Sequence, residues 1–409
     1  MSTIDVRPLD PDDLRSAHTL FGAALHHAPA DDAAWARIAS SYSPGRTLGV
    51  HEDGALVATA TSFPSEMAVP GGAVLPFAAV TRVGVRADHT RRGLLTAMMR
   101  AQLEDVAARG EAFASLRASE ARIYGRFGYG VATRGRGVRV RADAALVRAD
   151  APRTGTVRLL ERAEIAPVLR DVHARIALRR AGGMTRNDGW WGLLLERRLE
   201  VDRAHVLALV HRGPDGDDGF ALARLGDEPG AGFAERRLDV VDLHAADAAG
   251  TAALWGFLLG TDLIGSVQGD LRPLDEPLEL LLTDPRACAV TGQGDEVWLR
   301  IVDVPTALAA RGYGTAEPVL LAVHDALREA NAGVYRIADG VAERVGPLGG
   351  PVRPELECGV AGLAMAYLGD RRPSELVATG WWTAPDAAAV PRADAAFATA
   401  TSPWCGTFF

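Results

Sequence analysis

The chain has 409 residues, 48% of them hydrophobic and 23% charged, with a formal net charge of −8 at pH 7. This length suits two or three domains with substantial cores, and the acidic balance argues against wholesale nucleic-acid binding. The first residues, MSTIDVRPLD, are too acidic for a signal peptide. The longest apolar run, Gly359–Leu368, is far shorter than the ~18 residues of a membrane-spanning helix. We therefore expect a soluble, cytoplasmic protein that does not insert into membranes.

The basic residues are unusual in type and in distribution. All 44 are arginines, and the chain contains no lysine. Between Arg86 and Arg141 there are 12 arginines against 5 acidic residues, a local excess of positive charge in an acidic chain. Such a patch is typical either of a site for a small anionic ligand or of a solvated surface.

Neither the cysteines nor the histidines indicate a metal site. The cysteines Cys288, Cys358 and Cys405 are widely spaced and odd in number, so they form neither a disulfide framework nor a metal clamp. Asp242-Leu243-His244 and His26-His27 lack a third ligand at a sensible spacing. We expect no metal.

The first part of the chain predicts the element order βααβββαβαβ. Asp10 is expected to cap the first helix, with Pro11 as its first residue. The helix that begins at Gly93 has one apolar face, and Gly110 is expected to end it. The predicted elements are strand Ile4–Arg7, helices Pro11–His26 and Asp32–Ser41, strands Thr47–Val50, Ala55–Ser62 and Val74–Val85, the helix from Gly93, strand Ala112–Leu116, helix Glu120–Arg126 and strand Val131–Val140.

A second unit repeats the order βααβββαβ in pattern rather than in identity. The first unit has Arg91-Arg92-Gly93 at the start of its third long helix, where unpaired N–H groups and the arginines suit a diphosphate. The second unit has Asp247 there, which would repel a diphosphate, so we expect this unit to be scaffold. Its predicted elements are strand Val157–Leu159, helices Glu161–Leu178 and Asn187–Leu199, strands Ala204–His211, Phe220–Leu225 and Arg237–Leu243, helix Asp247–Leu259 and strand Leu263–Gln268.

From about Asp295 the pattern changes to a third, α+β unit, and we set the domains at residues 1–142, 143–294 and 295–409. The chain ends in SPWCGTFF. Burying a large apolar side chain contributes about 1.5–3 kcal/mol, so Trp404, Phe408 and Phe409 are expected to dock rather than fray. The predicted elements are strands Val297–Val302, Val319–His324 and Val334–Ala338 and helices Pro305–Ala310, Gly359–Leu368, Pro373–Thr379 and Pro385–Ala398.

Two segments of the first unit resemble a known family. The turn Thr90–Leu95, TRRGLL, is similar to the Gln/Arg-x-x-Gly-x-Gly/Ala turn of GNAT acyl-coenzyme A N-acyltransferases, although its first and last positions differ. The segment Ala118–Gly130, with IYGRFGYG, resembles the enhanced intracellular survival (Eis) branch, which also has RRGLL. The resemblance spans the whole chain. It implies an α/β (α+β) fold: tandem GNAT domains with mixed sheets flanked by helices, the second degenerate, then a sterol-carrier-protein-like α+β domain.

The same resemblance implies an activity. It implies acetyl transfer from acetyl-CoA to primary amines of small polycations, aminoglycosides foremost and at several positions, by a homohexamer. Lysine acetylation on proteins or peptides stays open. A different class of function, an apolar-ligand carrier with a vestigial acyltransferase, also stays open, although the intact RRGLL and IYGRFGYG segments favour the enzyme.

The resemblance also assigns site residues. Tyr124 would protonate the leaving thiolate, and the terminal carboxylate of Phe409 would orient the amine or relay its proton through water. Trp35, His26 and Phe408 are expected at the acceptor pocket. Acetyl-CoA would be held by Val83, Gly84 and Val85 of the fourth strand, by Arg91, Arg92, Gly93, Leu94 and Leu95, and by Ser119.

Each assignment has a structural alternative. Tyr124 would be a core tyrosine, Arg91 and Arg92 solvated residues, Ser119 the N-cap of the short helix, and Phe409 an inert end. The family's acceptor pocket is acidic, whereas this chain has Leu25-His26-His27-Ala28 after the first helix and Phe408 before the end. We therefore expect a more apolar and less anionic pocket. The pairs Trp190-Trp191 and Trp381-Trp382 are expected in the core or at a subunit interface.

Overall fold

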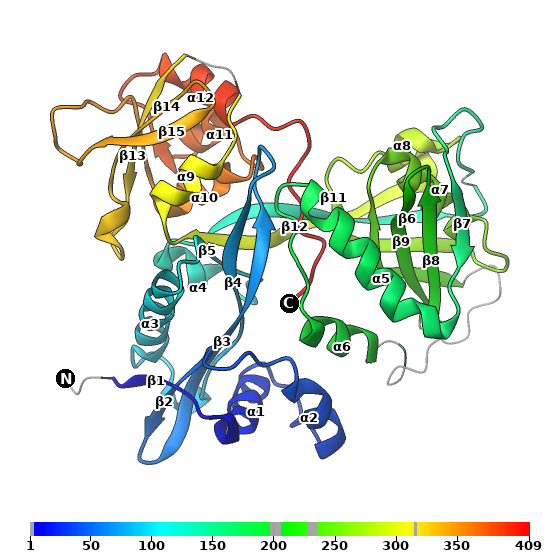
Figure 1. Cartoon of the computed structure of the whole chain (residues 1–409), viewed down its shortest axis with the longest axis horizontal. Coiled ribbons are helices and arrows are strands. Elements are labelled where there is room, and N and C mark those ends of the chain that lie inside the picture. The colour runs from blue at the N-terminus through cyan, green and yellow to red at the C-terminus, as the bar shows by residue number, and fades with distance from the viewer. Residues whose placement is uncertain (1–3, 145, 197–198, 200–205, 227–235, 315–316) are drawn as a thin grey trace.

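A computed structural model describes residues 4–144, 146–196, 199, 206–226, 236–314 and 317–409 (Figure 1). The fold is α/β, with two related units and a third, α+β unit. The third unit lies at one end, and the C terminus ends between the first two units (Figure 1). No helix among the described residues is long and apolar enough to span a membrane.

A single sheet runs through the first two units in the order β1-β2-β3-β4-β5-β12-β6-β11-β10-β9-β8-β7. The first unit supplies β1 (Val6–Pro8), β2 (Thr47–Glu52), β3 (Ala55–Ala68), β4 (Val74–Val85), β5 (Phe113–Leu116) and β6 (Gly130–Arg141). The second supplies β7 (Thr156–Leu159), β8 (Val206–Gly213), β9 (Gly216–Leu225), β10 (Arg237–Ala245), β11 (Ser266–Pro273) and β12 (Cys288–Ile301). Each unit has one parallel pair, β4 with β5 and β10 with β11.

The two units exchange their last strands. β12 of the second unit pairs with β5 of the first, and β6 of the first pairs with β11 of the second. β6 and β12 also pair with each other, from Gly130 opposite Leu299 to Val140 opposite Cys288. Each unit's sheet is therefore completed by the other unit. The expected boundary between residues 294 and 295 falls inside β12. The sequence does not indicate this, because pairing between strands far apart in the chain leaves no local pattern.

The helices follow the repeated order that the sequence predicts. In the first unit they are α1 (Leu14–Ala24), α2 (Asp32–Ala39), α3 (Leu94–Ala108) and α4 (Ala121–Tyr124), and in the second α5 (Arg162–Ile176), α6 (Asp188–Glu196), α7 (Ala248–Leu259) and α8 (Leu278–Leu281). Asp10 holds the predicted N-cap position, with Pro11 as the first helical residue, but the helical segment starts as a 3-10 turn at Pro11–Asp13 and the Asp10 side chain caps no N–H group. Gly110 does end α3, with φ of 73°. Residues 197–198 and 204–205, expected in a helix end and a strand start, lie outside the described residues.

The third unit has a sheet in the order β15-β14-β13-β16-β17. Its core is continuous with that of the first unit, since Phe63, Phe77 and Phe113 share one cluster with Tyr367 and Phe397. Its strands are β13 (Val319–His324), β14 (Gly333–Ala338), β15 (Val341–Gly346), β16 (Leu356–Gly359) and β17 (Trp382–Thr383). Its helices are α9 (Val304–Ala310), α10 (Val360–Tyr367), α11 (Pro373–Ala378) and α12 (Ala389–Phe397).

Candidate active site

β4 separates from β5 at the segment that the sequence assigns to acetyl-CoA. The two strands pair only from Phe77 to Ala79, so the main chain of residues 80–85 has no strand on that side among the described residues. On the other side the register with β3 shifts, and Arg82 and Val83 face the single residue Ala60. Arg82 has φ of 51°, a strained conformation for a bulky residue. The bulge and the split leave Val83, Gly84 and Val85 able to pair with an extended ligand.

The predicted phosphate site at the start of α3 is built from backbone rather than from a side-chain cap. Gly93 has φ of 85°, and no side chain bonds the first N–H groups of the helix. Arg92 binds the Glu52 carboxylate through two hydrogen bonds of 2.8 and 2.5 Å. Arg91 is exposed and has no partner among the described residues. Leu94 and Leu95 pack onto the core of the first unit. Arg91 is therefore the arginine of this turn that is available to a ligand.

Tyr124 is a buried residue that packs against a second tyrosine. It ends α4, its ring lies 5.8 Å from that of Tyr129, and its hydroxyl bonds no described residue. Burial, with a smaller contribution from the charge of Glu120, raises the pKa of Tyr124 to about 12. The phenol therefore stays protonated at neutral pH, as a proton donor must. Ser119 is exposed and forms no hydrogen bond with any described residue, and Glu120 rather than Ser119 holds the N-cap position of α4.

Two glycines of the IYGRFGYG segment are explained by packing. A Cβ at Gly130 would lie 2.2 Å from the Ala361 carbonyl oxygen of α10. Gly128 has φ of 85°, and a Cβ there would lie 2.7 Å from Val360 Cγ1. These glycines let the third unit approach the end of the Tyr124 segment closely.

The C-terminal tail docks at the junction of the first two units, as the sequence predicts. Trp404, Cys405 and Thr407 are buried, and the Phe409 ring packs edge-to-face on Phe63 at 5.9 Å. Phe408 differs from the prediction, since it is 71% exposed. Its carbonyl accepts a 2.7 Å hydrogen bond from Trp190 Nε1, while the Arg117 guanidinium lies 5.2 Å from its ring centre.

Glu296 of β12 anchors the tail from one side. Its buried carboxylate accepts hydrogen bonds from the Cys405 and Gly406 N–H groups at 3.1 and 2.7 Å. It also accepts one from Arg117, which in turn donates to the Thr407 carbonyl at 2.6 Å. Two backbone donors and a buried cation on one carboxylate fix the direction of the last residues.

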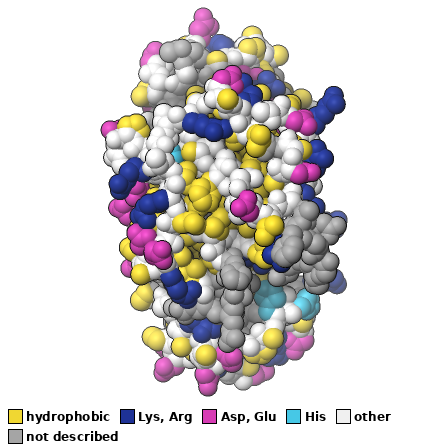
Figure 2. Space-filling model, turned by 90° about the vertical axis from the view of Figure 1, so that its right-hand side faces the viewer, with side chains coloured by type: hydrophobic (Ala, Val, Ile, Leu, Met, Phe, Trp, Pro, Cys, Tyr) yellow, Lys and Arg dark blue, Asp and Glu magenta, His cyan; other side chains and the backbone are white. Residues whose placement is uncertain are grey.

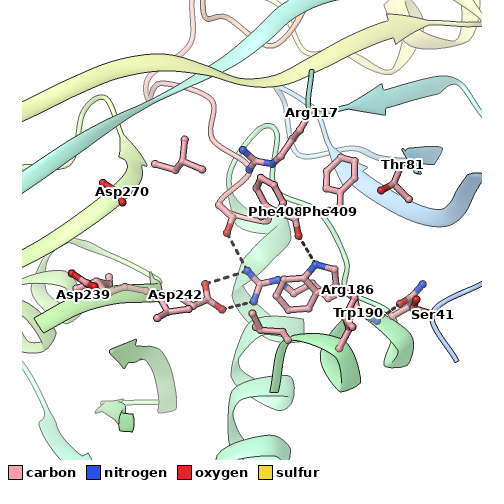
Figure 3. Close-up of a pocket in the computed structure, with 18 of the residues that line it drawn as sticks. Ser41, Thr81, Arg117, Arg186, Trp190, Asp239, Asp242, Asp270, Phe408 and Phe409 are labelled. Atoms are coloured by element: carbon pink, nitrogen blue, oxygen red, sulfur yellow. Dashed lines mark hydrogen bonds and ion pairs between the residues drawn. The ribbon is translucent and has the colours of Figure 1, made fainter. Parts of the chain in front are cut away.

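Arg186 anchors the tail from the second unit. It donates to the Gly406 carbonyl at 3.1 Å and to Thr407 Oγ1 at 3.0 Å, and it binds Asp242 at 2.6 Å. Burial alone would raise the pKa of Asp242, but the charge of Arg186, with His244, holds it well below its usual range. Trp190, which we expected in a core or an interface, stacks on Arg186 at 4.0 Å and belongs to the site. Figure 3 shows Arg186 joined to both Asp242 and the tail.

A cavity of about 1020 Å³ opens beside the docked tail, with walls from both units. Phe408, Phe409 and Thr81 of β4 line it (Figure 3), and Arg82 of β4 lines it as well. Its described lining carries seven arginines and three aspartates: Arg37, Arg82, Arg117, Arg186, Arg224, Arg237, Arg272, Asp239, Asp242 and Asp270. The excess of arginine is a property that the sequence analysis did not predict.

Comparisons with known proteins agree with this architecture. Residues 5–132 and 182–301 each match a family model described as an acetyltransferase (GNAT) domain, and residues 304–406 match a sterol carrier protein domain. The N-acetyltransferase Eis of Mycobacterium bovis is 37% identical over 342 residues, which are 81% of this chain and 80% of that protein. The crystal structure of Eis1 from Mycobacterium abscessus superposes with a TM-score of 0.89 at 37% identity, with both chains fully covered. An uncharacterised N-acetyltransferase of Streptomyces griseus is 35% identical over the full length of both chains.

The chain belongs to the Eis-like GNAT N-acetyltransferases. As an Eis-like protein it is an acyltransferase with tandem GNAT domains, and GNAT domains use acetyl-CoA. A GCN5-related N-acetyltransferase from Anabaena variabilis, 20% identical with a TM-score of 0.84, shows the same fold over the full length of both chains. Among the described residues of this Eis-like chain, no group of three or more His, Cys, Asp or Glu side chains is arranged to hold a metal ion.

Not every predicted site residue of the Eis-like chain reaches the cavity. Trp35 is absent from the described lining and packs against His18 at 5.9 Å. Ala34, Arg37 and Ile38 line the cavity instead, because these positions share a different face of α2. His26 is exposed in the turn after α1 and is also absent from the lining. Tyr124 lies outside the lining, in the part of the first unit that follows β5.

Sequence reasoning missed four residues that shape the site: Arg82, Arg117, Arg186 and Glu296. Arg82 and Arg117 were within reach of a sequence argument, because one directly precedes Val83 and the other directly follows β5. Arg186 and Glu296 were not, since each meets the tail across more than a hundred residues of sequence.

Proposed function

We propose that this protein transfers the acetyl group of acetyl-CoA to a primary amine of a small molecule bound in the cavity beside the C-terminal tail. The observation that carries this proposal is the placement of the tail. Phe408 and Phe409 line the same cavity as Thr81 and Arg82, and Val83 follows directly in β4. The acceptor cavity therefore adjoins the strand assigned to the acyl donor.

On the donor side, bound acetyl-CoA supplies an acetyl thioester. Arg91 and the N–H groups of Gly93, Leu94 and Leu95 bind its diphosphate, and Arg92 stays paired with Glu52. The free main chain of Val83, Gly84 and Val85 pairs with its extended arm, and an N–H group there stabilises the carbonyl oxygen as it gains charge. The exposed Ser119 hydroxyl is a further contact.

On the acceptor side, the amine has to lose a proton and the sulfur has to gain one. Tyr124 is the proton source for the sulfur that leaves as the amine nitrogen takes the acetyl group. The carboxylate of Phe409 holds the ammonium form of the acceptor and passes its proton to water, because an α-carboxylate is too weak a base to remove it alone.

The family resemblance extends this proposal to small polycations, with aminoglycosides acetylated at several positions. The cavity of about 1020 Å³ is large enough for such molecules. Its seven arginines against three aspartates, however, disfavour a polycation by Coulomb repulsion. The test therefore has to include aminoglycosides, although the charge of the cavity disfavours them as acceptors.

The test is a coupled thiol-release assay with acetyl-CoA and a panel of diamines, amino acids, aminoglycosides and lysine peptides. We expect acceptor-dependent release of coenzyme A with small amines. Release with no amine in the panel would refute the proposal. Because the chain has no lysine, acetyl-lysine detected in the peptide arm comes from the peptide and not from the enzyme. Faster turnover of peptides than of small amines would select protein lysine acetylation instead.

The structure gives the apolar-carrier alternative little support. The interior of the third unit is filled by large side chains, since Tyr335, Tyr367, Trp382 and Phe397 are each at most 2% exposed. Lipid that co-purifies with the protein, together with no affinity for acetyl-CoA, would favour a carrier.

Assembly as a homohexamer in the cytoplasm, without a nucleic-acid partner, stays part of the proposal. On the face in Figure 2, hydrophobic side chains gather near the centre and charged ones border them, a composition that suits a subunit contact. The second unit also exposes Leu146, Leu159, Leu263 and Leu280. Sedimentation velocity tests the hexamer, and a monomer at micromolar concentration would rule it out.

A further inference from the structure

Arg82 is a cavity-lining cation without a counter-ion among the described residues. Its guanidinium donates a 2.6 Å hydrogen bond to Ser41 Oγ and stacks on the Tyr42 ring at 4.4 Å. No other hydrogen bond or ring contact joins Arg82 to a described residue, and no described carboxylate forms an ion pair with it. An arginine offers five N–H donors, so most of the donors of this one remain available to a ligand in the cavity.

The groups packed around Arg82 are neutral at physiological pH. Burial, and then the charge of Arg82, lowers the pKa of His18 to about 4. Burial raises the pKa of Tyr42 to about 12, and its hydroxyl lies 3.2 Å from His18 Nδ1. Ser41 donates to the Ile38 carbonyl at 2.6 Å, so it receives its hydrogen bond from Arg82 as a neutral hydroxyl. The described part of the first unit thus holds a partly buried charge that it does not neutralise.

The acidic side chains that line the cavity do not neutralise Arg82 either. All three belong to the second unit, and two of them are already paired. Asp242 is held by Arg186 at 2.6 Å, and Asp239 by Arg237 at 2.5 Å. Asp270, which accepts a long hydrogen bond of 3.5 Å from Gln268, forms no ion pair with Arg82. No described carboxylate, that of Phe409 included, forms an ion pair with Arg82, so the neutralising group is absent from the described chain.

The backbone at Arg82 also indicates a ligand site. The residue is in the left-handed region, in a bulge that turns its side chain away from the regular pleat of β4. The cofactor's phosphates are not the natural partner, because Arg91, Arg92, Gly93, Leu94 and Leu95 are all absent from the cavity lining. An anion bound by Arg82 would enter with the acceptor.

We propose that the acceptor is a primary amine that also carries a carboxylate, and that Arg82 binds this carboxylate and so determines acceptor specificity. This inference rests on the proposed acetyltransferase activity and names its substrate class. Arg82 is a specificity residue and does not itself take part in acetyl transfer. With the carboxylate at Arg82 and the amine at the Phe409 carboxylate, a zwitterionic acceptor meets a complementary charge at each end.

The test compares pairs of acceptors that differ only in the carboxylate. We would measure kcat/KM for ω-amino carboxylates with roughly three to six methylenes and for lysine, against the matching carboxamides. Wild-type enzyme should prefer the carboxylates by roughly tenfold to a hundredfold, the range of a charge-assisted hydrogen bond. Arg82→Gln should bring this ratio close to one, by lowering kcat/KM for the carboxylates far more than for the carboxamides. Arg82→Lys should keep part of the preference.

Arg100→Gln is the matched control, because Arg100 is exposed on α3 and its substitution removes the same charge away from the cavity. It should leave the ratio unchanged, and thermal melting of each variant checks folding. Three results would overturn the inference: no carboxylate preference in the wild type, a preference that survives Arg82→Gln, or faster turnover of aminoglycosides than of every carboxylate. If no amine releases coenzyme A at all, the proposed activity fails instead.

Discussion

The helices α3 and α7, which follow the fourth strand of the first and second units, start in opposite ways. α3 begins after Gly93 with no side chain bonded to its first N–H groups, and Arg91 is exposed beside it. α7 begins after Asp247, whose carboxylate accepts a 2.8 Å hydrogen bond from the Gly250 N–H. The second unit therefore provides its own anion at the position that the first leaves open.

The two units also differ in the short helix after their fifth strand. α4 ends at Tyr124, and α8, the corresponding helix of the second unit, ends at the buried Leu281. Yet the second unit is more than a support, because residues 239–243 of β10 and Arg186 form a wall of the cavity. A repeated fold can thus place its donor site in one copy and use the other copy to shape the acceptor pocket.

The largest expected effect comes from removing the Tyr124 hydroxyl, which the second unit lacks at the end of its corresponding helix. Tyr124→Phe removes the hydroxyl at this place, and kcat should fall by roughly a hundredfold to ten-thousandfold because proton transfer to the sulfur is lost. The KM for acetyl-CoA should change little. Steady-state kinetics with a saturating acceptor measure both constants.

Tyr313→Phe is the control for loss of a hydroxyl. Tyr313 donates to the Leu308 carbonyl in the third unit, so its loss should lower stability by about 1 kcal/mol and leave kcat unchanged. The pH profile gives a second check. Since burial raises the pKa of Tyr124 to about 12, the proton donor stays protonated, and wild-type kcat should not decline through phenol ionisation until that pH is approached. A decline centred near the ordinary phenol pKa would show that burial does not raise the pKa of the donor, and its absence in Tyr124→Phe would show whether that donor is Tyr124.

The next effect concerns the tail that both units hold. A few residues added after Phe409 would move the terminal carboxylate, while Glu296, Arg186 and Trp190 would still anchor residues 405–408. We expect kcat to fall by about a hundredfold, since a displacement of about 1 Å at a reacting centre has that effect. The same residues added at the N terminus should have no effect. Full activity with the extended C terminus would show that Phe409 is a packed but inert end.

A smaller effect is expected at the open helix start. Arg91→Gln should raise the KM for acetyl-CoA by roughly threefold to tenfold without lowering kcat, because an exposed charge in water makes a modest contribution. The effect should shrink as salt is added, since mobile ions screen exposed charges. Arg100→Gln, within α3 itself, should leave the KM unchanged. Equal increases of the KM in the two variants would indicate that the overall positive charge of this surface attracts acetyl-CoA, and that Arg91 does not contact its phosphates.

Sequence alone reaches the features that local pattern encodes. It places β4 at Val74–Val85 with the observed bounds, and it predicts the docked tail from its aromatic residues and the open helix start from Arg91 and Gly93. It misses the exchange of β6 and β12, because both strands have the same alternation whichever partner they take. It also misses the bulge that turns Arg82 into the cavity, since left-handed φ at an arginine has no sequence signal. The sequence therefore predicts a less anionic acceptor pocket, but not the arginines that line it.

The smallest expected effect concerns the second unit, at the start of α7. Asp247→Ala removes the cap of α7 and should lower the free energy of unfolding by about 1 kcal/mol, the usual contribution of an N-cap. It should change neither kcat nor the KM for acetyl-CoA, because the second unit has Ala245 and Ala246 where the first has Arg91 and Arg92. Urea unfolding and donor titration measure the two outcomes. Asp31→Ala, which removes the 2.7 Å cap of α2 in the first unit, is a matched control for stability. If Asp247→Ala instead created a second site for coenzyme A, the aspartate would be the only barrier to donor binding in that unit, and the second copy would be a blocked site and not a scaffold.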